Sequence, residues 1–220
     1  MNTNQSSSLS KVSPRQVAVI GSGAMGSGLA RLLSASGHAV TLGSRDPAAA
    51  AARLADLPVV DPAAAVRGAE VVFLAVPFAE AAALAGLVGT LEGRVVVDLS
   101  NPLTPDYMGL TVGFTDSAGE TVARAFPGAK VVKAFNTVFA GVLVDALKGE
   151  RNLPSVLVAG DDDEAKALVM ELARGAGFSA YDAGALANAR YLEPLAELQI
   201  QLAYGRGHGA RIGFVLRTAA

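Results

Sequence analysis

Residues 17–45 constrain the fold of this chain more than any other stretch. Residues 17–20 are an apolar run, a glycine turn follows, and the next segment carries apolar side chains at helical spacing. Residues 39–43 form a second apolar run. The segment is therefore predicted to be a strand–turn–helix–strand unit. Two parallel strands joined by a helix imply a parallel sheet covered by helices on its faces.

The glycine turn matches the pattern G-x-G-x-x-G. Its first glycine permits the tight turn, its second lets a pyrophosphate approach the backbone, and its third lets the helix pack close to the strand. The helix start adds free N–H groups and the positive end of the helix dipole. We predict that this turn binds a dinucleotide, and the alternative is a glycine-rich turn that binds nothing. The residues concerned are Gly21, Ser22, Gly23, Ala24, Met25 and Gly26.

The tip of the second strand indicates which dinucleotide binds. NAD sites usually place Asp or Glu there, about 20 residues after the turn, to accept from the ribose 2′-hydroxyl. Here the tip is Ser44-Arg45, and Arg can meet two oxygens of a 2′-phosphate at once. Asp46 is the competing candidate for an NAD site. We interpret it as the start of the next helix, with Pro47 in the first helical position, and so favour NADP(H).

Composition excludes several classes of function. The chain of 220 residues has a net charge of −2, which argues against nucleic-acid binding, and it has no cysteine for disulfides or thiol chemistry. No apolar run reaches the length of a membrane span, so we expect no membrane partner. Residues 1–14 are rich in Ser and lack the apolar core of a signal peptide, which predicts a disordered tail and a cytoplasmic protein.

Apolar runs alternate with helical patterns along the remaining chain. The predicted fold class is α/β, a Rossmann-type doubly wound, mostly parallel sheet with the order 3-2-1-4-5-6 at its centre. Residues 15–185 form the NADP-binding domain, and residues 186–220 form a small C-terminal helical extension packed on it. Further strands are expected at 57–60, 70–76, 94–99, 130–135, 155–159, 178–182 and 211–216. Helices are expected at 47–55, 61–66, 78–91, from 117, at 140–147, after 161 and at 192–204, with a loop at 103–116.

Ligands of such sheets lie outside the carboxyl ends of the strands. We therefore expect the 2′-phosphate beside the second strand and the nicotinamide over the fourth to sixth. The residues at these later strand ends are Ala75, Val76, Pro77, Phe78, Asn101, Pro102, Asn136 and Thr137. The Asp-rich run at 161–164 is interpreted as a helix cap, so no metal is expected.

The strand ends lack an obvious acid or base. His38 precedes the second strand at the wrong end of the sheet, and His208 lies in a Gly-rich stretch. The expected groups are neutral, which still allows hydride transfer between two flat cofactor rings held face to face. Three aromatic side chains are candidates for the walls of that slot, with ordinary core packing as the alternative: Phe78, Phe135 and Phe139.

From residue 17 to residue 216 the chain resembles the NADPH-dependent reductases of the deazaflavin coenzyme F-420 (F420). The matching segments are residues 21–26, 43–45, 76–77, 130–137, 160–163, 182–184 and 186–190, with Glu193. The stretch through Phe135-Asn136-Thr137 also resembles the NADPH domain of the STEAP metalloreductases. The archaeal deazaflavin enzymes tend to have His where Asn136 stands and a basic residue where Ala49 stands.

The resemblance implies NADP(H) at residues 22–25, Ser44, Arg45, Val76 and Pro77. It also implies coenzyme F420 near Asn136, Thr137, Ala140 and the C-terminal residues, and a flavin-like acceptor is the variant of this interpretation. Asn136 is expected to position the reacting rings. The predicted function is thus an NADP-dependent oxidoreductase with a small-molecule redox acceptor, and the alternative is an NADPH-binding sensor without catalysis. The apolar surface of residues 192–204 predicts a homodimer.

Overall fold

The computed structural model describes residues 13–219, so all but the last two residues of the predicted N-terminal tail lie outside it. One eight-stranded sheet organises this part of the chain, in the order β3-β2-β1-β4-β5-β6-β7-β8. All neighbouring strands are parallel except β6 and β7. The predicted α/β fold and central strand order are therefore confirmed. The strands are β1 (Gln16–Ile20), β2 (Ala39–Gly43), β3 (Val59–Val60), β4 (Val71–Leu74), β5 (Val95–Asp98), β6 (Lys130–Lys133), β7 (Val156–Gly160) and β8 (Ala180–Asp182).

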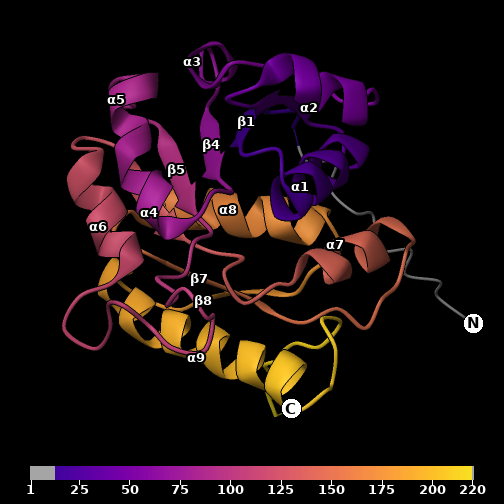
Figure 1. The fold of residues 1–220 in the computed structure, drawn as a ribbon, viewed down its shortest axis with the longest axis vertical. Helices are drawn as coiled ribbons and strands as arrows, with labels where there is room; N and C mark the ends of the chain where they lie inside the picture. The colour runs from indigo at the N-terminus through magenta and orange to yellow at the C-terminus, as the bar shows by residue number, and fades with distance from the viewer. Residues whose placement is uncertain (1–12, 220) are drawn as a thin grey trace, which may run out of the picture.

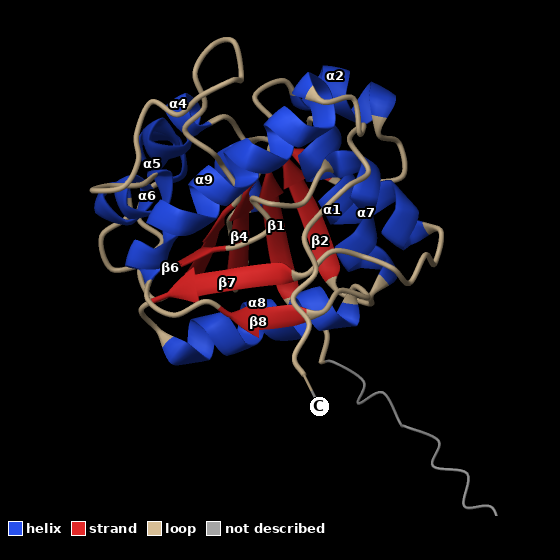
Figure 2. Cartoon of the chain, turned by 90° about the horizontal axis from the view of Figure 1, so that it is seen from below, coloured by secondary structure: helices blue, strands red, loops and turns tan. Residues whose placement is uncertain are grey.

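Helices cover both faces of the sheet (Figure 2). The strand β7 lies beside β8, with α8 packed against both. The helix α9 lies along the opposite side of the molecule from α2 and α3 (Figure 1). The helices are α1 (Ala24–Ala35), α2 (Pro47–Arg53), α3 (Pro62–Ala65), α4 (Phe78–Ala81), α5 (Ala85–Val88), α6 (Ala118–Ala125), α7 (Ala140–Leu147), α8 (Asp163–Gly175) and α9 (Ala189–Ile200). Short 3-10 turns η1 (Ala82–Leu84) and η2 (Leu186–Asn188) and a π-helical turn η3 (Gln201–Gly205) complete the described part.

The core follows from the two-residue period of the strands. Val17 and Val19 of β1 pack into one cluster, with residues of α1 and α8, whereas Ala18 and Ile20 pack into the cluster on the other face. Such double burial explains why the central strands are apolar without alternation. In the described residues, no helix is long and apolar enough to cross a bilayer.

Two sequence-based expectations were wrong in detail. Residues 211–216 form no strand, although the backbone N–H of Ser155 donates to Phe214 O at 2.9 Å. The neighbouring Pro154 has no N–H to continue such a ladder, and it lies against Gly213. The single helix expected at 78–91 is instead the series α4, η1 and α5, which ends at Gly89 with φ +73°.

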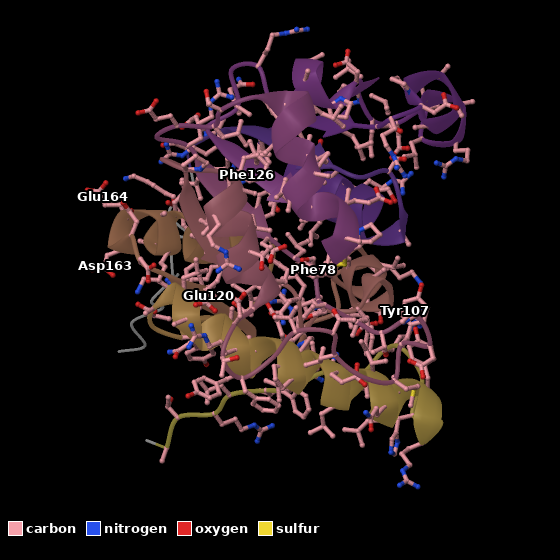
Figure 3. The ribbon with its side chains drawn as sticks, turned by 60° about the vertical axis from the view of Figure 1, so that its left-hand side comes forward. Phe78, Tyr107, Glu120, Phe126, Asp163 and Glu164 are labelled. Carbon is pink, nitrogen blue, oxygen red and sulfur yellow. The ribbon has the colours of Figure 1, made fainter. Side chains whose placement is uncertain are left out.

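The capping interpretations are confirmed. Asp46 accepts from Ala49 N at 3.0 Å at the start of α2, and Ser117 accepts from Glu120 N at 3.1 Å at the start of α6. Asp162 caps α8 in the same way, at 2.8 Å from Ala165 N. The next two carboxylates of that run, Asp163 and Glu164, point outward from the molecule (Figure 3).

Candidate functional site

The glycine turn has the geometry of a phosphate cradle. Gly21 has φ +122°, and a Cβ there would lie 2.2 Å from Ala75 O. A Cβ on Gly26 would lie 1.9 Å from Gly21 O, so this position is closed by backbone packing. Gly23 is different, because a Cβ there would meet no atom within 4 Å. The turn is thus tightly packed on its inner side and open at Gly23, where the first N–H groups of α1 face outward.

The tip of β2 adjoins this turn. Ser44 is buried, and its Oγ lies 3.2 Å from Ser22 Oγ and donates to Asp46 O at 3.1 Å. Arg45 is exposed over 73% of its side chain, and its Nη1 lies 3.2 Å from Glu80 Oε2 on α4. Asp46 is committed to capping α2. The tip of β2 therefore presents the Arg45 guanidinium beside the turn, together with the Asp46 carboxylate, whose Oδ1 is used in the cap of α2.

A cavity of about 350 Å³ joins the glycine turn, the β2 tip and the end of β4. Its walls include most of the predicted binding residues at these three strand ends. Asp46, the competing NAD candidate, also lines it, as do Pro62, Glu80 and Leu84, which sequence analysis did not single out. The predicted residues in the wall are Gly21, Ser22, Gly23, Ser44, Arg45, Ala75, Val76 and Pro77. Phe78 starts α4 next to this wall but does not line the cavity.

A second cavity, of about 230 Å³, lies at the ends of β5 and β6 under α9. It is lined by Met25, Leu99, Asn101, Phe135, Asn136, Thr137, Val138, Phe139, Ala140, Ala196, Gln199 and Ile200. None of these side chains is ionisable. The structure thus brings Met25 of α1 together with the predicted residues after β5 and β6. Pro102 does not line it, because its carbonyl accepts from Thr111 N at 2.7 Å and braces the following loop.

Asn136 links three elements at this cavity. Its Nδ2 donates to Asn101 Oδ1 at 3.1 Å and to Leu192 O at 2.9 Å, while Asn101 Nδ2 donates to Asn136 O at 2.9 Å. Both amide protons of Asn136 are therefore used within the protein. These bonds form a brace that ties the β6 end to α9.

A third cavity is an apolar slot of about 490 Å³, lined by Asp106, Tyr107, Met108, Phe139, Ile200 and Tyr204. Phe139 and Tyr204 meet edge to face with ring centroids 6.1 Å apart. Tyr107 comes from the loop after β5 (labelled in Figure 3) and has φ +60°, in the left-handed region. A strained loop residue and a π-helical turn at one slot are features that cluster at ligand sites.

The three aromatic candidates for the slot have different fates. Phe139 lines both the slot and the second cavity. The ring of Phe135 is core, because the residue is 1% exposed and packs edge-on against Phe73 and Phe178. Phe78 lines neither space. Core packing, the alternative that the sequence left open, is thus correct for Phe135.

A buried charge cluster lies next to the second cavity and was missed by sequence analysis. Lys133 Nζ lies 2.8 Å from both Asp98 Oδ2 and Glu193 Oε1, and it donates to Ser100 O. These three side chains are almost wholly excluded from solvent. Glu193 also accepts from the backbone N–H groups of Ala118 and Gly119 at the start of α6. One ammonium thus faces two carboxylates, the second of which also has two backbone donors, and the cluster fixes α9 to β5, β6 and α6.

Glu120 and His38 are among the groups whose pKa values are shifted. The Arg190 guanidinium on α9 donates to Glu120 on α6 and lowers the pKa of that carboxyl. Burial lowers the pKa of His38; the negative charge of Glu171 opposes this and the positive charge of Arg15 adds to it. His38 Nδ1 accepts from Arg15 N at 3.3 Å at the amino end of β2, remote from the cavities at the strand ends.

Comparison with known proteins identifies the family. Residues 16–102 match the family model described as NADP oxidoreductase coenzyme F420-dependent. The F420-dependent NADP reductase of Methanothermobacter marburgensis is 34% identical over 207 residues, which are 85% of this chain and 92% of that protein. Metalloreductase STEAP3 of Rattus norvegicus is 37% identical over 82% of this chain, which spans only 36% of that protein.

A solved structure agrees with the sequence comparison. A proposed F420-dependent NADP reductase from Arthrobacter sp. FB24 superposes with a TM-score of 0.83 at 33% identity, over 93% of this chain and 100% of that one. Both the likeness in sequence and the likeness in fold therefore extend beyond the dinucleotide-binding half. The chain belongs to the family of coenzyme F420-dependent NADP oxidoreductases.

Proposed function

We propose that this protein binds NADPH along the carboxyl ends of β1, β2 and β4 and transfers hydride to a deazaflavin or flavin-like acceptor. The observation that carries the proposal is a shared wall. Phe139 and Ile200 line both the cavity at the ends of β5 and β6 and the apolar slot beside it. A nicotinamide in the cavity at the ends of β5 and β6 and a flat acceptor ring in the apolar slot would contact the same two side chains.

The residues present fit the dinucleotide. The open position at Gly23 leaves room for a pyrophosphate, and the N–H groups at the start of α1 supply its donors. Arg45 supplies a cation for a 2′-phosphate, as the sequence predicted. Gly21, Ser22, Ser44, Val76 and Pro77 form the remaining walls of this cavity.

The protein's part in the reaction is positioning. NADPH supplies a hydride, which is two electrons and one proton, and the acceptor takes a second proton from water. Since no ionisable side chain lines the cavity proposed for the nicotinamide, the part of the chain there is to hold the ring in place for the transfer. The brace from Asn136 to Leu192 O holds α9, and with it Ile200, against the cavity.

The activity test is NADPH oxidation assayed against deazaflavin F420, FMN, FAD and quinones. We expect turnover with F420 or a flavin, and turnover falling about 10- to 100-fold in Asn136→Ala through lost positioning, with NADPH binding less affected. Asn136→His introduces the archaeal residue and should favour F420. Tight NADPH binding without oxidation by any acceptor would instead support the sensor. Full activity of Asn136→Ala with every acceptor would place the acceptor elsewhere.

A further inference from the structure

The charged residue facing the proposed 2′-phosphate position from the opposite wall is Glu80. Arg45 comes from the tip of β2 and Glu80 from the first turn of α4, and both line the cavity that contains the glycine turn. Their side chains meet at 3.2 Å. The other carboxylate near the tip, Asp46, also lines this cavity, but its Oδ1 caps α2 and Arg45 pairs with Glu80 instead. Glu80 is therefore the acidic group that shares Arg45 with a bound ligand.

We propose that Glu80 is a specificity-determining residue, which weakens the preference of this cavity for NADPH over NADH. The inference rests on the proposed function, because it assumes that the 2′-phosphate binds at Arg45. A phosphate must take Arg45 from Glu80 or share it, and it then lies close to a second negative charge. A ribose 2′-hydroxyl is neutral and can donate to the same carboxylate, as it does to the acidic residue of NAD sites.

Physical magnitudes make the effect measurable but limited. An exposed ion pair contributes less to binding or stability than a hydrogen bond between a phosphate and a guanidinium. The phosphate therefore displaces Glu80 from Arg45, and NADPH remains the preferred cofactor. Glu80 is 39% exposed in its side chain, so salt screens its charge. The residue adjusts the preference and does not reverse it.

Calorimetric titration with NADPH and NADH tests the inference in Glu80→Gln, which keeps the shape and removes the charge. We expect NADPH to bind about 3- to 10-fold more tightly than to the parent protein, with NADH binding unchanged or weaker. The gain should shrink at 0.5 M salt, since it is electrostatic. Glu164→Gln on α8 is the matched control, because it removes the same charge from a side chain that is 92% exposed and far along the sequence from the cavity.

The outcomes separate the inference from the proposed function. NADPH that fails to bind the parent, or that binds Arg45→Ala as tightly as the parent, overturns the assignment of the 2′-phosphate to Arg45. In a second outcome, NADPH binds the parent through Arg45, but the ratio of NADPH affinity to NADH affinity in Glu80→Gln stays within twofold of the parent ratio. That result overturns only the role of Glu80. An equal gain in Glu164→Gln also overturns it, because net charge would then explain the effect.

Discussion

Gly23 shows how one missing side chain distinguishes binding from folding. Its backbone, at φ −73° and ψ −177°, is open to any residue, and a Cβ there would meet nothing. We expect Gly23→Val to fold but to lose NADPH, since the branched side chain fills the space of the pyrophosphate. Calorimetric titration measures the expected loss of NADPH binding, and thermal unfolding shows whether the variant is folded. Gly86→Val, also in open space, is the control for adding valine, and unchanged affinity in folded Gly23→Val would refute the cradle.

His38 makes stability depend on pH. Its pKa is lowered from the ordinary 6.5 by burial, and its Nε2 has no partner among the described residues. As the pH falls below about 6.5, the unfolded chain takes up a proton that the folded chain resists, so the free energy of unfolding decreases. Urea unfolding at pH 7 and pH 5 should show this loss, and His38→Gln should reduce it. An identical loss in both proteins would exclude His38 as its source.

At the scale of elements, α9 is attached through buried charge. Glu193 pairs with Lys133 and accepts from two backbone N–H groups of α6. Glu193→Gln keeps the volume but leaves Lys133 with one carboxylate fewer, and it puts amide protons against donors. Breaking a buried pair costs about 3–5 kcal/mol, so we expect a loss of that order in chemical denaturation. The exposed Glu164→Gln should change stability by less than about 0.5 kcal/mol, and a similar effect from both would contradict the attachment.

At the same scale, sequence patterns predicted which helices and strands form more accurately than they predicted where each one ends. The strand–turn–helix–strand unit and the caps at Asp46 and Ser117 depend on residues close together in sequence, and they are confirmed. The central strand order, predicted from the alternation of strands and helices, is confirmed too. The strand expected at 211–216 was wrong because a ladder needs a partner with free N–H groups, and Pro154 has none. Apolar spacing alone does not reveal that partner.

At the scale of the whole molecule, the predicted homodimer now depends on different side chains. Leu192 is buried in its own chain, whereas Tyr191 and Leu198, seven residues apart on one face of α9, are 70% and 51% exposed. We still expect a dimer that covers this face. Light scattering at micromolar concentration should give twice the monomer mass, and Leu198→Lys should shift it toward the monomer. A monomeric parent would end this prediction.

The local sequence was sufficient to predict the arrangement of the glycine turn and the β2 tip. Each feature there is set by backbone freedom, spacing or side-chain chemistry within about 30 residues. The glycine turn, Ser44 and Arg45 meet at one cavity as expected. Only the tertiary structure showed what faces them. Glu80 reaches Arg45 from α4, Glu193 reaches Lys133 from α9, and Phe139 joins two cavities under Ile200. These contacts depend on where distant segments pack, and no period or motif in the chain records that choice.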